Sequence, residues 1–192
     1  MIKAFIILAA FFSGEAKDVK VNTKASTIVW SGSKVVGKTH TGTLELASGT
    51  LDISKGELKG GSFTVDMKTL VDTDLEGEWK QKLEGHLRSD DFFGVETYPT
   101  AAFKITEVKS AGGDAYDVTG DITIKGKTES VSFTTSLTEV ADGYEASASI
   151  TIDRSKFDVR YGSGSFFDDL GDKAINDEFT LDVKLVTGTT GS

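Results

Sequence analysis

The residues best suited to acid–base chemistry lie in one short stretch of the chain, positions 84–103. His86, one of the two histidines in the sequence, is followed there by Asp90 and Asp91. An imidazole paired with a carboxylate can move protons to and from a substrate, as in a hydrolase or isomerase. The alternative interpretation is a histidine at the C-terminal end of a helix, followed by aspartates that accept hydrogen bonds from turn N–H groups. We favour this alternative, because neither a nucleophile nor an oxyanion donor is marked nearby.

Other chemical signatures in the sequence are weak. No GxSxG, HExxH, Walker A or GxGxxG motif occurs, and the run Gly162–Ser165 lacks the lysine of a phosphate loop. Cysteine is absent, so a metal site would need carboxylates beside His40 or His86. The spacing of the aspartates at positions 72, 74, 90, 91, 168, 169 and 172 does not match a calcium-binding EF-hand loop. We therefore predict no catalytic residue, no cofactor and no metal.

The composition is that of a globular protein with an acidic surface. The chain has 192 residues, of which 38% are hydrophobic, and a formal net charge of −9. This length favours one domain with a substantial core, which must supply the stability that disulfides cannot. The negative charge makes nucleic acid and anionic membrane surfaces poor partners.

The N-terminal residues differ from the rest of the chain. Met1–Lys3 carries a positive charge, Ala4–Phe12 is continuously apolar, and Gly14 and Ala16 are small residues at the usual cleavage positions. This pattern predicts a signal peptide over residues 1–16, with a buried N-terminal strand or helix as the alternative. The apolar run is too short to span a bilayer, so we expect no stable membrane insertion. The folded domain is expected over residues 17–187, followed by a flexible tail over 188–192.

From Lys17 onward, apolar and polar residues alternate in many short runs. Phe63, Val65 and Met67 form one such run, which is typical of a strand with one buried and one solvated face. Turn-forming residues separate the runs at positions 54–56, 111–114, 125–127 and 141–143. Short links of this kind join antiparallel strands. About eight strands, each apolar on one side, predict an all-β barrel or sandwich.

One segment has a helical period instead. Its apolar residues recur every four positions, at Leu75, Trp79, Leu83 and Leu87. This stripe predicts an amphipathic helix over residues 74–89 that packs against the sheet. Thr73 and Glu76 have the spacing of a capping box at the start of this helix.

The interior of a closed barrel would be lined by the inward-facing apolar residues of the strands. An eight-stranded barrel is either filled by its own side chains or holds one small ligand. Small residues on the inner face leave room beside the large ones, but the periodicity alone does not decide between these outcomes. The predicted lining residues are Phe63, Phe103, Ile122, Phe133, Ala146, Ala148, Ile150, Phe179 and Leu181.

Three blocks of the sequence closely resemble the YceI-like family. They are HLRSDDFFGVETYPTAAF from His86, VTGDITIKGKT from Val118 and IDRSKF from Ile152. The blocks follow one another in the family's order, and the resemblance extends roughly from Val19 to Val186. It implies an extended, antiparallel, eight-stranded lipocalin-like barrel with one helical segment, exported to the bacterial periplasm. It also implies that the apolar interior holds the chain of a polyisoprenoid lipid.

The leading functional hypothesis is therefore non-catalytic binding and transport of an isoprenoid-type or similar long-chain lipid in the periplasm. One alternative is a lipid hydrolase or isomerase that uses His86 with Asp90 or Asp91. Another is an interaction protein whose core is filled and holds no ligand. The sequence also leaves open whether the protein forms a homodimer. Because arginine grips phosphate bidentately, we expect an anionic head group to be held near arginine, although each arginine could instead pair with surface carboxylates. The predicted head-group residues are His86, Arg88, Arg154, Arg160 and Tyr161.

Overall fold

Nine strands, one α-helix and two short 3-10 helices make up residues 16–188, the part of the chain that the computed structural model describes. The predicted signal peptide, apart from Ala16, and residues 189–192 of the predicted tail lie outside the described residues. In chain order the elements are β1 (Lys17–Lys20), β2 (Thr27–Ser33), β3 (Thr39–Ser54), β4 (Glu57–Asp72), α1 (Gly77–Arg88), β5 (Thr100–Gly112), β6 (Ala115–Ile124), β7 (Lys127–Val140), β8 (Gly143–Asp153), η1 (Arg154–Phe157), η2 (Gly171–Lys173) and β9 (Glu178–Val186).

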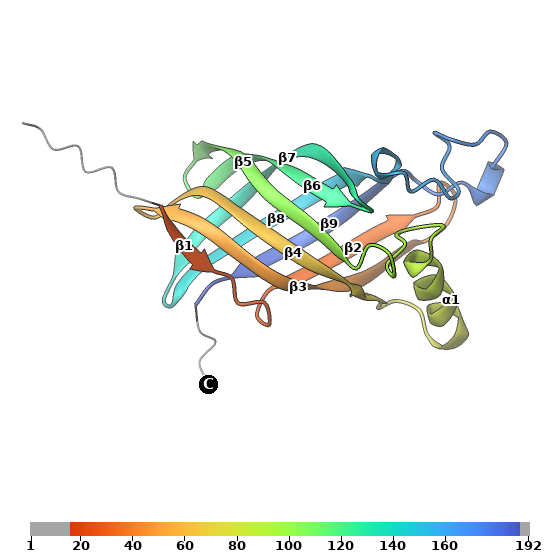
Figure 1. Ribbon diagram of the computed structural model, residues 1–192, viewed down its shortest axis with the longest axis horizontal. Helices are drawn as coiled ribbons and strands as arrows, with labels where there is room; N and C mark the ends of the chain where they lie inside the picture. Colours follow the sequence, from red (N-terminus) through yellow and green to blue (C-terminus); the bar gives the residue numbers. More distant parts are fainter. Residues whose placement is uncertain (1–15, 189–192) are drawn as a thin grey trace, which may run out of the picture.

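The strands form one antiparallel sheet that closes on itself. The order β3-β2-β9-β8-β7-β6-β5-β4 returns to β3 through the β3–β4 pairing, which makes a closed barrel of eight strands. The short strand β1 pairs with the end of β3 outside this ring. The predicted all-β, eight-stranded antiparallel barrel is thus confirmed, and Figure 1 shows its elongated shape.

Turn chemistry explains two of the hairpins. Lys55 and Gly56 both have positive φ between β3 and β4, as do Lys125 and Gly126 between β6 and β7. Two residues of positive φ match the twist of the flanking strands in a two-residue hairpin loop. The other two predicted turns join β5 to β6 and β7 to β8, so all four predicted turn positions are confirmed.

Strands β3 and β4 are each 16 residues long, so each extends for roughly 50 Å along its own direction. Their pairing is irregular: between Asp66 and Val71, β4 bulges away from the register that the hairpin turn sets. Gly42 lies beside this bulge, where a Cβ atom would come within 1.9 Å of the Val71 carbonyl oxygen and 2.4 Å of the Trp30 ring. Trp30 Nε1 donates a hydrogen bond of 3.1 Å to the same carbonyl. Glycine is therefore required at position 42.

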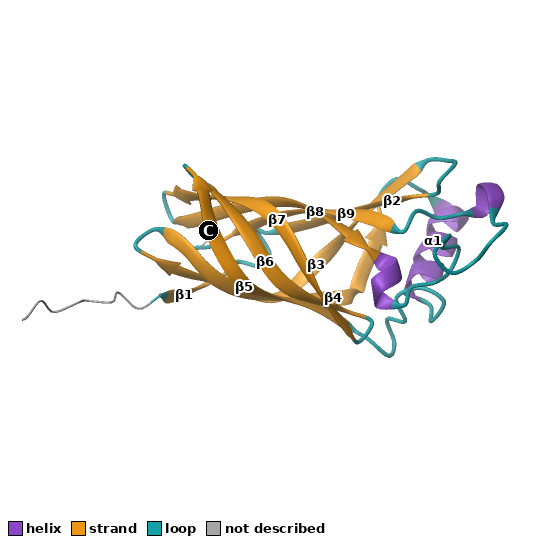
Figure 2. Ribbon diagram, turned by 90° about the horizontal axis from the view of Figure 1, so that it is seen from above, coloured by secondary structure: helices purple, strands orange, loops and turns teal. Residues whose placement is uncertain are grey.

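The helix differs from its prediction in length, cap and packing. Helix α1 begins at Gly77 and ends at Arg88, and its N-cap residue Glu76 makes no side-chain capping bond. The predicted capping box is wrong, because the Thr73 hydroxyl donates to the Thr41 carbonyl instead. No residue of α1 is buried, and Trp79 is 72% exposed. The predicted packing of Trp79 against the sheet is wrong, because α1 lies across one end of the barrel (Figure 2).

The irregular segments gather at one end of the barrel. Figures 1 and 2 show α1 and the 160–177 segment together at the end opposite the β3–β4, β5–β6 and β7–β8 turns. We call the end with α1 and the 160–177 segment the mouth end, and the end with the three turns the closed end. Within residues 16–188, no helix is both long and apolar enough to cross a membrane.

Candidate functional site

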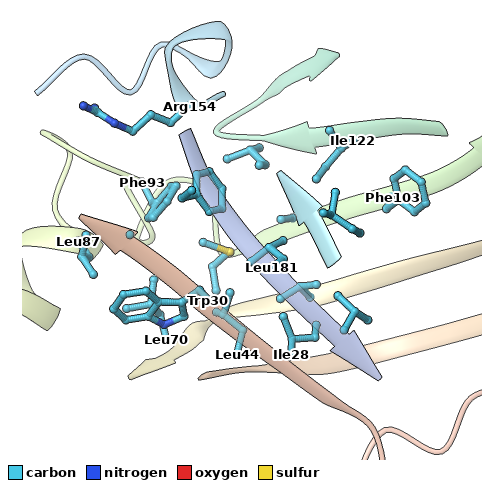
Figure 3. A pocket seen from close by; sticks show the side chains of 18 of the residues that line it. Ile28, Trp30, Leu44, Leu70, Leu87, Phe93, Phe103, Ile122, Arg154 and Leu181 are labelled. Carbon is cyan, nitrogen blue, oxygen red and sulfur yellow. The ribbon is translucent and has the colours of Figure 1, made fainter. Parts of the chain in front are cut away.

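A large apolar cavity occupies the barrel and has a volume of about 920 Å³. This volume lies near the upper end of the usual range for small-molecule pockets, about 300–1,000 Å³. Its wall includes the exposed side chains of Trp79 and Lys82 on α1, so the cavity opens at the mouth end. Figure 3 shows apolar side chains from several strands, including Ile28, Ile122 and Leu181, around the same space.

All nine side chains predicted to face the interior lie on the wall of this cavity. The rings of Phe103 and Phe133 are 5.6 Å apart, and those of Phe63 and Phe103 are 6.4 Å apart and nearly parallel. These three rings are only partly buried, because one side of each faces open space. A tightly packed core would bury them completely, so the interior is a cavity and the filled-core alternative is wrong.

His86 and Tyr161 form a polar edge at the mouth of the cavity. Their ring centroids are 4.3 Å apart in an edge-to-face arrangement, and the Phe92 ring lies 5.6 Å from His86 on another side. His86 Nε2 is buried and has no hydrogen-bond partner. Both residues line the cavity, so this nitrogen is positioned to bind a polar atom of a ligand.

Arg154 also reaches the cavity wall, but its guanidinium group is fully engaged by the protein. It donates to the backbone carbonyls of Val159, Tyr161, Ile175 and Asn176 at 2.7–3.0 Å, and lies 3.3 Å from an Asp177 carboxylate oxygen. Arg154 is 2% exposed, its guanidinium carbon lies 5.3 Å from the centroid of the Phe92 ring, and Figure 3 shows the group pointing away from Ile122 and Leu181. Burial lowers its pKa from the usual high value, while Asp177 and Asp153 act in the opposite direction. Arg154 therefore ties the 159–177 segment to the barrel and keeps no donor for a ligand.

The other two arginines lie away from the cavity. Arg88 donates to the Leu70 carbonyl oxygen and lies 4.0 Å from Glu84, and Arg160 pairs with Asp158. Neither residue is among those that line the cavity. The placement of Arg88 and Arg160 as head-group residues is thus corrected: of the five predicted, His86, Arg154 and Tyr161 reach the wall.

The pairing of His86 with an aspartate, which the alternative enzyme hypothesis requires, does not form. Asp90 and Asp91 are exposed, and no hydrogen bond among the described residues joins either of them to His86. The Asp90 backbone carbonyl instead accepts a hydrogen bond from Lys125. His86 lies in the last turn of α1, as the favoured interpretation expected, but the turn N–H groups of Phe92 and Gly94 donate to the Ser89 backbone carbonyl and not to the aspartate side chains.

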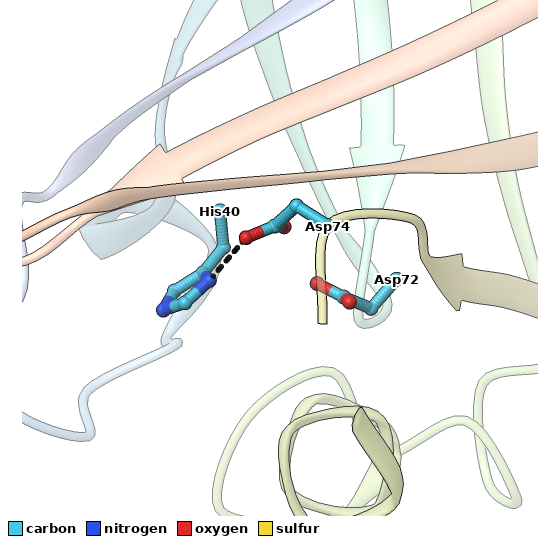
Figure 4. Close-up of side chains that lie close together, drawn as sticks. All are labelled: His40, Asp72 and Asp74. Atoms are coloured by element: carbon cyan, nitrogen blue, oxygen red, sulfur yellow. Dashed lines mark hydrogen bonds and ion pairs between the residues drawn. The ribbon is translucent and has the colours of Figure 1, made fainter. Parts of the chain in front are cut away.

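A polar cluster that the sequence did not reveal lies beside the mouth. His40 Nδ1 is 3.0 Å from Asp74 Oδ2, and the Asp72 carboxylate lies close to both (Figure 4). Burial raises the pKa of Asp72, and the neighbouring Asp74 carboxylate acts in the same direction. Burial alone would raise the pKa of Asp74, but hydrogen bonds from the Thr41 N–H and the His40 ring outweigh it and lower the pKa.

Exposed apolar side chains surround the mouth. They come from the β2–β3 connection, from α1 and from the 160–177 segment, three parts of the chain that meet at this end (Figure 1). Large exposed apolar patches on a protein surface commonly mark sites of interaction. We call this set the apolar rim: Val35, Val36, Trp79, Tyr161, Phe166 and Phe167, which are 40–72% exposed.

A closed antiparallel barrel with an apolar interior that opens at one end defines the class of lipocalin-like barrels, which can hold one small ligand. The model of the YceI-like domain matches residues 20–187, and the chain belongs to this family. The predicted resemblance is confirmed.

Curated relatives match part of the chain. A UPF0312 protein of Pseudomonas aeruginosa strain LESB58 is 35% identical over 108 residues, which cover 48% of this chain and 56% of the relative. A UPF0312 protein of Pseudomonas putida strain F1 is 35% identical over 94 residues, which cover 48% of this chain and 46% of the relative. The chain thus matches about half the length of these relatives.

Solved structures share the fold over most of their length. BcnA of Burkholderia cenocepacia is 24% identical, with a TM-score of 0.72 over 88% of this chain and 99% of that one. A polyisoprenoid binding domain from Saccharophagus degradans, implicated in plant cell wall breakdown, is 14% identical with a TM-score of 0.67. That alignment covers 91% of this chain and 99% of the other. At these identities the likeness shows the fold alone.

Proposed function

We propose that this protein binds a long-chain isoprenoid-type lipid in its barrel without changing it chemically. The observation that carries the proposal is the apolar cavity of about 920 Å³, which runs between the strands and opens at one end. Transfer of an apolar chain from water into this cavity is favourable by roughly 25 cal/mol for each Å² of apolar surface that is buried. The YceI-like family assignment and the polyisoprenoid-binding neighbour support this ligand class.

The polar end of the lipid is expected at the mouth, beside His86 and Tyr161. His86 Nε2 is buried without a partner, and a ligand hydroxyl or carbonyl would satisfy it. Arg154 has no free donor, and Arg88 and Arg160 lie outside the wall. The cavity wall therefore offers no arginine clamp for a phosphate; its other cationic side chains are Lys34, Lys82 and Lys173, and we propose a head group that His86 Nε2 can bind.

We infer that the lipid is carried in the periplasm and that the apolar rim is where it enters and leaves. The N-terminal pattern of a charged residue, an apolar run and small residues supports export. The exposed rim side chains surround the opening, so a lipid chain crosses apolar surface on its way in. A hydrolase or isomerase would need an acid–base pair, and His86 lacks its carboxylate partner among the described residues.

Native mass spectrometry of the protein purified from its own host tests this function. We expect a mass increment from one lipid per chain, which organic extraction releases unchanged and which identifies the chain and head group. A chain that carries no lipid, even after incubation with host lipid extract, would overturn the binding function. Steady conversion of the added lipid to a product would favour the enzyme instead.

A further inference from the structure

Three side chains from two parts of the chain converge next to the mouth of the barrel. His40 is the second residue of β3, Asp72 ends β4, and Asp74 lies in the connection from β4 to α1. Their potential ligand atoms all lie within 4.8 Å of one another, and Figure 4 shows the three side chains grouped together. The pairing of Gly42 with Asp72 and the hydrogen bond from the Thr41 N–H to Asp74 Oδ1 hold this arrangement.

The cluster contains a buried carboxylate oxygen without a partner. Asp72 is 0% exposed; its Oδ1 accepts from the Leu75 N–H at 2.7 Å, while its Oδ2 has no hydrogen-bond partner. Leaving a buried charged oxygen unsatisfied is costly, and the Asp74 carboxylate beside it adds like charge. The cations of α1 do not relieve this, because Lys80 and Arg88 pair with Glu84 instead.

We propose that His40, Asp72 and Asp74 form a binding site for one divalent transition-metal ion, for which Zn²⁺ is the best match. An imidazole with two carboxylates and no thiolate suits a borderline ion such as Zn²⁺, whereas Ca²⁺ and Mg²⁺ prefer ligands that are all oxygen. Ligands about 2.1 Å from a shared ion lie roughly 3.0–3.4 Å apart when they are adjacent. His40 Nδ1 and Asp74 Oδ2 are 3.0 Å apart and joined by a hydrogen bond, so a bound ion would replace this bond with little movement of the two side chains.

The site is open enough for an ion to reach it. The side chains of His40 and Asp74 are each 34% exposed, while Asp72 forms the buried side. Water can therefore complete the coordination from the solvent side. Zn²⁺ sites with three protein ligands usually keep such an open position.

A bound ion would also fix the segment that leads into α1. Asp72 binds the Leu75 N–H through its carboxylate, and its own N–H donates to Glu84 on α1 at 2.9 Å. Coordination of Asp72 and Asp74 would therefore hold the 72–75 connection against β3. We expect the amide protons of residues 73–79 to exchange more slowly when the ion is bound.

The test is a ZnCl₂ titration of tag-free protein that has been treated with EDTA and dialysed. Calorimetry should give one ion per chain, and the imidazole ¹⁵N signals of His40 should shift while those of His86 stay in place. His40→Ala and Asp74→Ala should each weaken Zn²⁺ binding at least about tenfold. Asp91→Asn, which removes an exposed carboxylate near the other histidine, is the matched control and should bind as the parent does.

Two results would overturn the site. One is the absence of stoichiometric Zn²⁺ binding to the folded parent, which would mean that a shared proton satisfies the two carboxylates. The other is binding that His40→Ala and Asp74→Ala leave unchanged. Tighter binding of Ca²⁺ than of Zn²⁺ would overturn the assigned class of ion. Because His40 and Asp74 are partly exposed, their variants should fold even if changes at buried Asp72 do not.

Discussion

The two ends of the barrel are made from the same alternating strands but differ in what holds them together. At the closed end, Ile53, Tyr116 and Leu137 are 4–8% exposed and pack in one cluster outside the wall of the cavity. At the mouth end, Leu70, Phe157 and Val159 are equally buried, but wall residues between the two clusters, such as Phe103 and Leu181, are only partly buried because they face open space. A packed cluster therefore lies toward each end, and the room for a ligand lies along the wall that joins them.

The mouth end depends on polar contacts in addition to the packing of its own buried cluster. The irregular 159–177 segment is held by the buried guanidinium of Arg154, which binds four backbone carbonyls and Asp177. Backbone in irregular loops cannot satisfy its own carbonyls as a strand ladder does. At the mouth end, the Arg154 side chain therefore supplies the hydrogen bonds that these backbone carbonyls need.

The largest effect is expected from removing that side chain. Arg154→Gln should lower the free energy of unfolding by about 3–5 kcal/mol, because it leaves buried carbonyls and Asp177 without their partner. Chemical denaturation measures the change. Arg160→Gln is the matched control: its side chain is 58% exposed, so little change is expected. Equal stability of the two variants would contradict the structural role of Arg154.

Two leucine substitutions compare the packing of the closed-end cluster with the packing of the cavity wall. Leu137 is 4% exposed in the closed-end cluster, so Leu137→Ala should cost about 2–5 kcal/mol in unfolding free energy. Leu181 lines the cavity and is only partly buried, so Leu181→Ala should cost about 1 kcal/mol. Denaturant titration of both variants gives the difference. A larger loss at Leu181 would mean that the cavity wall is packed as tightly as the closed-end cluster.

The polar edge of the cavity is tested by His86→Phe, which keeps the ring contact with Tyr161 but removes the unpartnered nitrogen. Affinity for a long prenyl alcohol should fall by about 0.5–1.5 kcal/mol, roughly twofold to tenfold. Affinity for an isoprenoid hydrocarbon of equal length should not change, which serves as the control. Titration of delipidated protein with both ligands measures this. An equal loss of affinity for both ligands would mean that His86 contributes through packing and not through its nitrogen.

The smallest effect on stability is expected at the apolar rim. Trp79 is 72% exposed, so Trp79→Ala should change the unfolding free energy by less than about 0.5 kcal/mol. Loading of lipid from vesicles should nevertheless become slower, because the apolar surface at the opening is reduced. The control is Val140→Ala, which removes an exposed apolar side chain at the closed end. Loading rates that are the same for both variants would contradict entry across the rim.

The barrel and its lining could be predicted from the sequence because they follow from local patterns. The period of two placed Phe63, Phe103 and Phe133 on one face, and turns such as Lys125–Gly126 joined neighbouring strands. Strand β2 was missed, because Ser31, Gly32 and Ser33 interrupt its alternation. Trp79 follows a helical stripe, but that stripe faces the cavity mouth instead of a packed surface.

The remaining features depend on contacts between distant residues. If the register set by the β3–β4 turn continued, Gly42 would pair with Thr69; the bulge after Asp66 brings it to Asp72 instead. The approach of His40 to Asp72 and Asp74 therefore has no local signal. The same holds for Arg154, whose carbonyl partners lie 5–22 positions away in an irregular segment.

The most direct test of the central claim is to fill the cavity and measure lipid binding. Ala148→Trp adds a large ring to the wall, whereas Ala111→Trp adds the same ring at an exposed position outside the cavity. Delipidated variants that remain folded should be titrated with a long prenyl alcohol. We predict that Ala111→Trp binds as the parent does and that Ala148→Trp loses at least tenfold in affinity. The added ring at position 148 should also lower the free energy of unfolding by about 1–3 kcal/mol. Equal binding by both folded variants would contradict a ligand in the barrel interior.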